Sequence, residues 1–512
     1  MTGIFFPQAD RMRGARLAPA RQERSMTSTR LTTLAIAAST ILPAPVAAQS
    51  QAERNQPLAS FLKTVVARAV TLSDAPPPPD IPEAIVHEAH FLAGANLSAA
   101  RGELNKAIAV QLATFPLSSS SGGFSYTVDP STGAVTPMSA TFGPLFAERA
   151  LTIGEGQFNF GLTYQHVTYD SFEGVDLRSG DMRFYLEHNN CCGSPEGPAD
   201  PNGPSDLEPF FERDLMETTL GVQVDTDSVA FFGTYGVTED FDVGLAIPIV
   251  SVNLDVTATA GIVRTATEDI PPLHSFDGHG GGTNTVRSSA GATGLGDIVL
   301  RGKYALYRDA IGAVAAGLDV RLPTGDRNDL LGTGATQAKF YLIGSSEIGR
   351  FSPHVNIGYT FSSGNVSPFV DQVVSAPDVP YDANTPDVSA VKDLSVPDEI
   401  NYAFGVNAAV LPRVTMAFDV VGRTLRDVPR FTVGRRTFES RTPGPLPSTP
   451  FQGDEELVFE TTTGNMNLVL GAFGWKINVT RTLLLNMSFL VPMNDSGLQP
   501  DITPHVGFDY VF

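Results

Sequence analysis

The chain ends on Asp501-Ile-Thr-Pro-His-Val-Gly-Phe-Asp-Tyr-Val-Phe512, and this stretch decides the fold. Phe508, Tyr510 and Phe512 share one face if the stretch is extended, and the residues between them share the other. Side chains that alternate with a period of two are typical of a β-strand. The sequence therefore predicts a strand that runs to the last residue, with one aromatic face and one mixed face.

The composition indicates a chain with much of its surface in an apolar medium. Of 512 residues, 42% are hydrophobic and only 17% are charged, against about a quarter in an ordinary soluble chain. The net charge of -21 and the 34 scattered Lys and Arg exclude a nucleic-acid partner, which needs a clustered basic face. The only cysteines, Cys191 and Cys192, are adjacent, so they predict a loop detail or a vicinal disulfide rather than a disulfide framework.

The first 48 residues have the organisation of an export signal. Residues 26–48 carry a charged start, a short apolar stretch and small residues before Gln49, which predicts a signal peptide cleaved after Ala48. The apolar stretch is too short for a spanning helix, which needs about 20 residues. Residues 1–25 are then an upstream mis-start or an extended charged region.

Residues 49–145 form a second region, which lacks strand alternation. Apolar residues recur at helical spacing in 57–70, which predicts a short amphipathic helix, and a second helical stretch spans 82–113. Four prolines at 76–79 separate the two. Two interpretations stay open for this region: a periplasmic extension beside the barrel, or a plug that enters the lumen.

Residues 146–512 read as a series of strands. Phe158, Phe160 and Leu162, for example, alternate with polar or small residues. A tilted strand needs about 9 to 11 residues to cross a bilayer, and each stretch is at least this long. The twelve stretches are 157–168, 218–236, 241–255, 296–307, 311–322, 336–346, 351–362, 399–411, 414–424, 462–477, 481–492 and 502–512.

The connections between these strands alternate in length. Turns of a few residues are followed by long loops rich in Pro, Gly and Asp, at 169–217, 261–294, 364–398 and 426–453. Outer-membrane barrels show this asymmetry, with short periplasmic turns and longer external loops. The terminal strand resembles the insertion signal of such barrels, carried here by Phe508, Tyr510 and Phe512. The predicted fold is all-β: a transmembrane antiparallel up-and-down barrel of about twelve strands, with a partly helical N-terminal extension.

Alternation also assigns the inner face of the predicted barrel. In 296–307, Leu300 and Tyr304 face lipid, while Arg301 shares the opposite face with other charged residues. A charge that faces the bilayer midplane costs about 2 to 4 kcal/mol, so this sorting is not accidental. The candidates for lining or constricting the lumen are Asp297, Arg301, Lys303, Asp319, Arg321, Lys339, His354, Asp419 and Arg423.

The inward charges have two interpretations. A turn centred near Asp309 places Asp297 opposite Arg321 and Asp319 diagonal to Arg301, so the charges form an ion-pair network that fixes strand register. Alternatively, they form a constriction that selects permeating solutes. Twelve strands lie between the small barrels that side chains fill and the large barrels that hold open channels, so barrel size does not decide.

No motif for catalysis or for a metal is found. The chain lacks a Gly-x-Ser-x-Gly elbow, a His-Glu-x-x-His pair and a phosphate-binding loop before a helix, and its eight His are scattered. The sequence therefore predicts no enzyme, no catalytic or metal-binding residue and no cofactor.

Three segments carry a family resemblance: Tyr235-Gly-Val-Thr-Glu-Asp-Phe-Asp-Val-Gly-Leu-Ala-Ile-Pro248, Gly294-Leu-Gly-Asp-Ile-Val-Leu-Arg-Gly-Lys-Tyr304 and Leu318-Asp-Val-Arg-Leu-Pro-Thr-Gly-Asp326. They resemble the outer-membrane transporters grouped as the "MetA-pathway of phenol degradation" family, which is linked to hydrophobic-compound channels of the long-chain fatty-acid type. The resemblance covers about 154–512. It implies a barrel that passes small aromatic or apolar compounds, and it carries over no binding residues.

The leading hypothesis is a passive channel in the outer membrane of a Gram-negative bacterium, for small aromatic or hydrophobic compounds. The alternative is a structural or surface-interaction barrel whose acidic external loops, above all 364–398, bind cations, lipopolysaccharide or a partner protein. The expected partners are outer-membrane lipid and lipopolysaccharide, the barrel-assembly machinery and a small-molecule solute. The oligomeric state does not follow from the sequence.

Overall fold

The structure is a computed structural model that describes residues 57–72, 139–180, 182–187, 215–263, 282–309, 311–363, 396–437 and 455–512, with the shorter pieces 111, 123, 126–128, 135–137, 276, 440–441 and 450–451. Among these residues, no helix has both the length and the apolar character that a membrane span requires.

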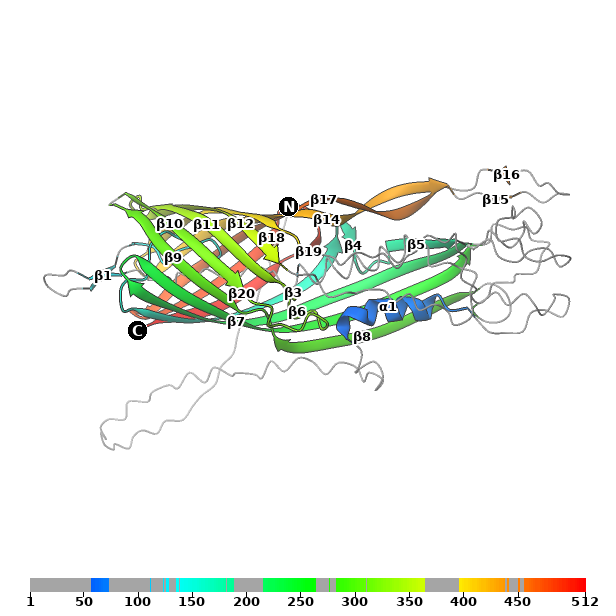
Figure 1. Ribbon diagram of the computed structural model, residues 1–512, viewed down its shortest axis with the longest axis horizontal. Coiled ribbons are helices and arrows are strands. Elements are labelled where there is room, and N and C mark those ends of the chain that lie inside the picture. Colours follow the sequence, from blue (N-terminus) through cyan, green and yellow to red (C-terminus); the bar gives the residue numbers. More distant parts are fainter. Residues whose placement is uncertain are drawn as a thin grey trace, which may run out of the picture. The chain divides into compact units, whose positions relative to one another are not determined.

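Twelve antiparallel strands form one closed ring, as the sequence predicts (Figure 1). Each ring strand pairs with two neighbours, so no edge of the ring is left unpaired. In chain order the ring strands are β3 (Phe158–Phe172), β6 (Leu215–Thr238), β7 (Phe241–Val263), β9 (Val299–Arg308), β10 (Gly312–Arg321), β11 (Thr336–Ser346), β12 (Phe351–Ser363), β13 (Glu399–Leu411), β14 (Val414–Thr437), β17 (Glu455–Thr480), β18 (Leu483–Pro492) and β20 (Thr503–Val511).

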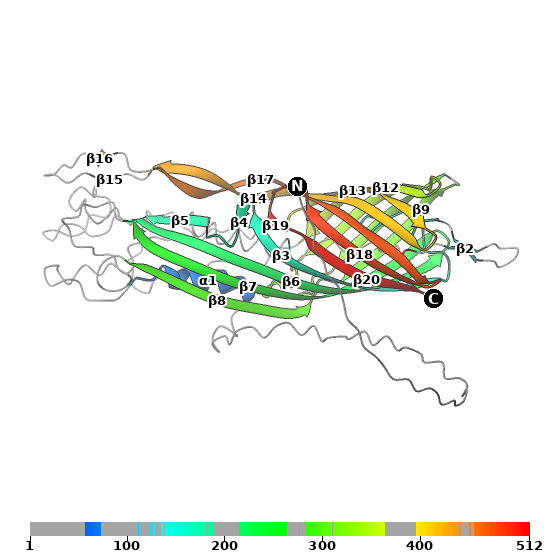
Figure 2. The same ribbon diagram turned by 180° about the vertical axis from the view of Figure 1, so that it is seen from behind.

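The C-terminal strand closes the ring (Figure 2). β20 pairs on one side with β18 and on the other with β3, where Val506 lies opposite Tyr164 and Tyr510 opposite Phe160. The last backbone N–H, that of Phe512, donates to the carbonyl of Phe158 at 2.9 Å. β3 pairs in turn with β6, so the first and last predicted strands meet.

The two ends of the ring differ. At one end, here called the short-turn end, brief turns join β6 to β7, β9 to β10, β11 to β12, β13 to β14 and β17 to β18, and the C-terminus lies there (Figure 1). At the other, the long-strand end, β6 and β7 project as one pair and β14 and β17 as another. These four strands have 23 to 26 residues, more than twice the about 9 to 11 that cross a bilayer, so part of each lies outside it.

Shorter strands extend the sheet or stand apart from it. β5 (Met182–Glu187) pairs with β6, β8 (Thr283–Leu295) with β7, and both β4 (Val175–Asp176) and β19 (Leu498–Pro500) with β3. Two small hairpins lie outside the main sheet: β1 (Tyr126–Val128) with β2 (Val135–Pro137), and β15 (Ser440–Arg441) with β16 (Pro450–Phe451).

The ring strands are apolar outside and polar inside. On β9, the outward-facing Leu300 and Tyr304 are 45% and 51% exposed, while the inward-facing Lys303 is 5% exposed. The same alternation continues around the ring, for example with Phe340 and Leu342 on β11 at 53% each. An apolar belt of this extent is unstable in water and is stable against hydrocarbon.

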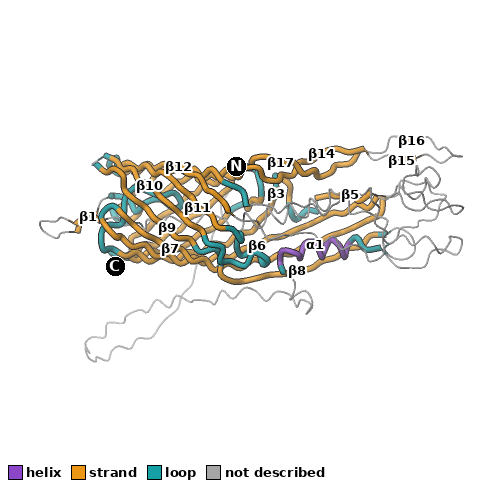
Figure 3. The backbone as a smooth tube through the Cα atoms, viewed as in Figure 1, coloured by secondary structure: helices purple, strands orange, loops and turns teal. Residues whose placement is uncertain are grey.

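The predicted helix 57–70 is confirmed as α1 (Leu58–Ala69), which lies at the long-strand end beside β7 and β8 (Figure 3). Its apolar stripe is buried in a core that it shares with the projecting parts of β6 and β7. The backbone N–H of Leu58 donates to Asp329 Oδ1 at 3.2 Å, and Asn284 Nδ2 donates to the carbonyls of Arg68 and Ala69 at 3.0 Å. These contacts satisfy one of the N–H groups at the start of the helix and two of the carbonyls at its end.

Three predicted loops are wrong in part, because strands continue beyond the membrane. β8 occupies the last third of 261–294, β5 lies inside 169–217, and β14 runs on through Thr437. Strand segments outside the bilayer need no lipid-facing apolar row, so they lack the alternation from which strands were predicted. The surface-loop hypothesis for 364–398 is affected little, since only 396–398 of that loop is described.

The predicted register between β9 and β10 is also wrong. Arg301 lies directly opposite Asp319, not diagonal to it, and Arg321 lies opposite Val299, not Asp297. The cause is the position of the turn: Ala313 pairs with Arg308, so the turn is centred between positions 310 and 311 rather than near Asp309. A β-bulge between Val314 and Ala315, with one extra residue on β9, offsets this shift only in part.

Other predictions fall outside the described residues. They are the segment 1–25, the signal peptide 26–48, nearly all of the second helical stretch 82–113, and the cysteines at 191 and 192. The division into an extension 49–145 and a barrel 146–512 stays a prediction. The structure places its boundary within an irregular segment that precedes β3.

Candidate functional site

An irregular segment before β3, residues 141–153 and here called the strap, lies inside the barrel at its short-turn end. Asp419 on β14 holds its first part. Oδ2 of this carboxylate accepts the backbone N–H groups of Leu145, Phe146 and Ala147 at 2.8, 2.9 and 3.3 Å. The other oxygen lies 2.8 Å from His354 Nε2, and Asp419 is fully buried. One carboxylate thus satisfies three N–H groups that have no strand partner.

Inward-facing side chains of other strands hold the rest of the strap. Asn356 on β12 accepts the N–H of Glu148 at 2.7 Å and donates to its carbonyl at 2.8 Å. Ser345 on β11 accepts the N–H of Ala150, and Lys303 on β9 donates to the carbonyl of Leu151 at 2.9 Å. Asp242 on β7 accepts the N–H of Ile153. The strap is therefore fixed to strands across much of the ring.

The strap leaves the lumen through a close backbone contact. Gly154 has a φ of 100°, a conformation that favours glycine. Its carbonyl oxygen lies 1.8 Å from the place where a Cβ on Gly236 would be, so only glycine fits at 236. Pairing with β6 then begins: the N–H of Gly156 donates to the carbonyl of Gly236 at 2.9 Å.

The strap residues are buried against the inner wall of the short-turn end. Leu145, Ala147 and Ala150 are at most 3% exposed. The ring of Phe146 lies edge-on against His505 of β20, with 5.1 Å between ring centroids. Since Phe146 also binds Asp419 through its backbone, the strap spans from β14 to β20 at this point.

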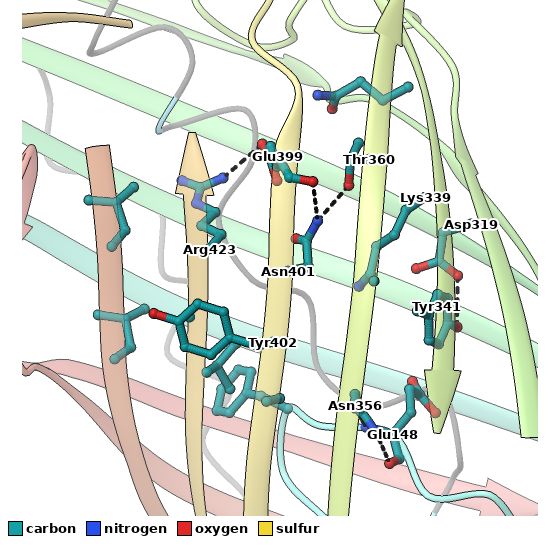
Figure 4. A pocket seen from close by; sticks show the side chains of 18 of the residues that line it. Glu148, Asp319, Lys339, Tyr341, Asn356, Thr360, Glu399, Asn401, Tyr402 and Arg423 are labelled. Carbon is teal, nitrogen blue, oxygen red and sulfur yellow. Dashed lines mark hydrogen bonds and ion pairs between the residues drawn. The ribbon is translucent and has the colours of Figure 1, made fainter. Parts of the chain in front are cut away.

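A cavity of about 170 Å³ lies in the lumen, on the side of the strap that faces the long-strand end (Figure 4). Strands β9 to β14 contribute its charged and polar wall, and β17, β19 and the strap contribute much of its apolar wall. Its lining includes Phe146, Glu148, Tyr169, Arg301, Asp319, Arg321, Lys339, Tyr341, Asn356, Thr360, Glu399, Asn401, Tyr402, Arg423, Leu468, Leu470 and Leu498.

The charged wall contains a connected group around Arg301. Arg301 Nη1 lies 3.2 Å from Glu148 Oε1, and its Nε lies 3.4 Å from Asp319 Oδ2. Tyr341 donates its hydroxyl to Asp319 Oδ1 at 3.0 Å, and Lys339 Nζ stands 4.7 Å from the centroid of the Tyr341 ring. Figure 4 shows Asp319, Lys339 and Tyr341 on adjacent strands, with Glu148 below them.

A second charged pair lies further round the wall. Arg423 on β14 reaches Glu399 on β13 at 3.6 Å, and Asn401 donates to Thr360 Oγ1 at 2.7 Å (Figure 4). Over the whole cavity, four basic residues (Arg301, Arg321, Lys339 and Arg423) face three acidic ones (Glu148, Asp319 and Glu399). The wall therefore has a small excess of positive charge.

The structure distributes the nine predicted lumen residues over three places, and their role in selection stays a prediction. Five line the cavity: Arg301, Asp319, Arg321, Lys339 and Arg423. Three hold the strap region: Lys303, His354 and Asp419. Asp297 binds a loop at the long-strand end, where it accepts the N–H groups of Gly325 and Thr333 at 3.0 and 2.8 Å.

Sequence reasoning missed several charged or aromatic contributors to the cavity, among them Tyr341, Glu399 and Glu148. Tyr341 and Glu399 both lie on predicted strands at inward positions, so strict alternation is a signal that could have found them. Glu148 had no such signal, because it lies on the strap, which has no periodicity. Within the described ranges, no group of three or more His, Cys, Asp or Glu is placed to hold a metal ion.

A closed ring with an apolar outer belt and a polar lumen defines an outer-membrane β-barrel protein. By sequence, residues 213–414 match the family described as "Putative MetA-pathway of phenol degradation". The predicted resemblance to that family is thus confirmed over this range. No curated protein matches the chain.

Solved structures with a similar fold include an outer membrane channel, a FadL homologue and a monoaromatic hydrocarbon channel. An outer membrane channel from Pseudomonas putida F1 has 11% identity and a TM-score of 0.39, covering 71% of this chain and 98% of that one. A FadL homologue from Pseudomonas aeruginosa has 10% identity and a TM-score of 0.29, covering 77% and 96%. The CymD monoaromatic hydrocarbon channel has 9% identity and a TM-score of 0.29, covering 70% of this chain and 89% of that one. At these scores the likeness adds nothing to the fold that strand pairing establishes.

Proposed function

We propose that this barrel is a passive outer-membrane channel for small aromatic or hydrophobic compounds. The observation that carries the proposal is the two-sided cavity in the lumen: Leu468, Leu470 and Leu498 on one side, and a charged wall around Arg301 on the other. Ligand cavities are mostly apolar with a few placed polar groups, and this one has both. The phenol-degradation description of the matched family fits an aromatic solute.

Transport by this route needs no cofactor and no coupled energy. A solute entering from the long-strand end would rest its apolar part on the leucines and Tyr402, and turn its polar group toward Lys339 or Arg423. Its way out is blocked by the strap, which is held by hydrogen bonds to inward-facing side chains rather than by strand pairing. Release of the strap from the wall would therefore open the short-turn end.

The remaining parts of the proposal concern orientation and partners. We place the short-turn end in the periplasm and the projecting strands outside, following the usual asymmetry of these barrels. The apolar belt would contact outer-membrane lipid and lipopolysaccharide. Phe508, Tyr510 and Phe512 would form the signal for the assembly machinery, after export directed by 26–48. Phe512 is 68% exposed and so is open to such a contact.

Planar-bilayer recording of the folded chain from Gln49 tests the function. Heat-modifiable gel mobility first establishes that the barrel is folded. The expected result is discrete ohmic steps whose amplitude falls when benzyl alcohol is added, because the alcohol occupies the apolar side of the cavity, while glycerol at the same concentration has no effect. A folded barrel whose current is equally indifferent to both compounds contradicts the proposal.

A further inference from the structure

Two buried cations at the short-turn end lack the partners that buried charges normally have. Arg149 on the strap is 3% exposed, and its Nε, Nη1 and Nη2 have no hydrogen-bond partner within the described residues. Lys476 on β17 is 4% exposed and likewise forms no hydrogen bond or ion pair there. A buried ion without a partner costs several kcal/mol, so natural chains rarely keep one, and the described residues include two.

The two cations lie close enough to influence each other, away from the cavity described above. Each is within electrostatic range of the other. Lys476 follows Leu470, which lines the cavity, by six residues on β17, or about 20 Å along the strand toward the short turn. Glu148 lines the cavity, but its neighbour Arg149 does not; the Arg149 guanidinium carbon lies 3.5 Å from the Cβ position of Gly143.

The nearby carboxylates are engaged with other groups. Those whose field reaches Arg149 are Glu347, Glu148 and Asp242; those whose field reaches Lys476 are Asp509, Asp419 and Glu148. Glu148 contacts Arg301, Asp242 contacts Lys303, and Asp419 contacts His354 and the strap. Glu347 accepts the Ser352 hydroxyl and Asp509 accepts an amide hydrogen of Asn486. These acids therefore leave the hydrogen-bonding positions of the two cations unfilled.

From this geometry we infer that Arg149 and Lys476 form a binding station for a small organic carboxylate at the short-turn end of the lumen. The inference rests on the proposed function and names the solute class as organic anions. A guanidinium whose N–H groups have no other acceptor can bind a carboxylate through two parallel hydrogen bonds, and an ammonium adds a third donor. Apolar strap residues, Leu145 and Phe146, lie alongside in the sequence and are buried in the same end of the barrel. That setting favours an aromatic acid over an inorganic anion.

Titration calorimetry of the full mature chain tests the station, with benzoate, benzyl alcohol and chloride as probes. We expect saturable binding of benzoate that neither benzyl alcohol nor chloride displaces. R149Q and K476Q should each weaken benzoate binding at least about tenfold. The matched control is R413Q, which removes an exposed arginine at the β13–β14 turn and should bind like the wild type.

A stability measurement separates this role from a structural one. Because Arg149 has no partner to lose, R149Q should unfold at the same denaturant concentration as the wild type or a higher one. A lower midpoint for R149Q would show that Arg149 holds the fold, and benzoate binding that is absent in the wild type or unchanged in both variants would overturn the inference. A barrel that conducts but does not bind benzoate defeats only this inference, whereas one that binds benzoate but never conducts defeats the proposed function.

Discussion

Asp419 and Lys339 both project into the lumen, but the regions around them use polar side chains differently. At the strap, inward-facing carboxylates and amides bind backbone groups of an irregular segment, as Asp419 does with three N–H groups. At the cavity, charged side chains contact one another or an aromatic ring, as Lys339 does with Tyr341, and leave a space of about 170 Å³. We propose from this comparison that the strap region closes the lumen and that the cavity region selects the solute.

The largest effect is expected from Asp419→Ala. The change leaves three buried N–H groups of the strap without an acceptor, at about 1 to 3 kcal/mol each, so unfolding should become easier by about 3 kcal/mol or more. The released strap should also raise the single-channel conductance. Fluorescence of the only tryptophan, Trp475, reports unfolding in urea. Asp419→Asn, which keeps an acceptor, is the control; lowered stability with unchanged conductance would mean that the strap does not obstruct the pore.

Gly236→Ala should have the next largest effect. Its methyl group would overlap the Gly154 carbonyl at the point where the strap leaves the lumen. Overpacking of this kind costs about 1 to 3 kcal/mol. Gly302→Ala, whose Cβ would stand 3.8 Å from Phe241, is the matched control. If urea unfolds both variants at the same concentration, the close contact at Gly236 does not hold the strap.

Lys339→Gln tests the cavity side of the comparison. Lys339 contributes a contact with the Tyr341 ring, so its loss should cost at most about 1 kcal/mol. The reversal potential in a salt gradient should shift toward cation selectivity, because the cavity loses one of its positive charges. Lys303→Gln breaks the contacts with Asp242 and the strap, and should instead lower stability. A loss of stability in Lys339→Gln as large as that in Lys303→Gln would remove the distinction between the two regions.

The smallest effect is expected outside both regions, at the β9–β10 turn. Asp309 accepts the N–H groups of Ile311 and Gly312, and these hydrogen bonds hold the pKa of its carboxyl below the usual value. A lowered folded-state pKa stabilises the fold above the unfolded value of about 3.9 and ceases to do so as the pH falls through the folded value. Asp309→Asn should therefore reduce the urea midpoint slightly at pH 7 and not at pH 2.5, with unchanged conductance. A change in conductance would show that the turn influences the lumen.

The barrel could be predicted from the sequence because lipid imposes a strict rule on it. Every lipid-crossing strand must alternate, and the two predicted ranges 336–346 and 399–411 coincide with β11 and β13. β8 was missed because its residues are small and polar, and it pairs only with β7 beyond the ring. The bulge on β9 was missed because no residue near the turn predicts it.

The candidate site could be predicted only in part, for the same reason. Arg301, Asp319 and Arg423 lie on alternating strands, so their inward direction follows from the pattern. Glu148 and Arg149 lie on an irregular segment, where neighbouring residues have no fixed direction and only the folded contacts reveal which faces the cavity. That Asp419 holds the strap was equally hidden, because the pattern assigns a face to a side chain but no partner.

A reversible lock on the strap tests the account most directly. Thr141 Oγ1 and Ser352 Oγ are 2.9 Å apart, so cysteines at both positions would bring their sulfur atoms within bonding reach. In a chain with Cys191 and Cys192 replaced by serine, planar-bilayer recording of Thr141→Cys/Ser352→Cys should show little current when oxidised and wild-type current after reduction. Equal current in the two states, with the disulfide verified, would contradict the claim that the strap must leave the wall for passage.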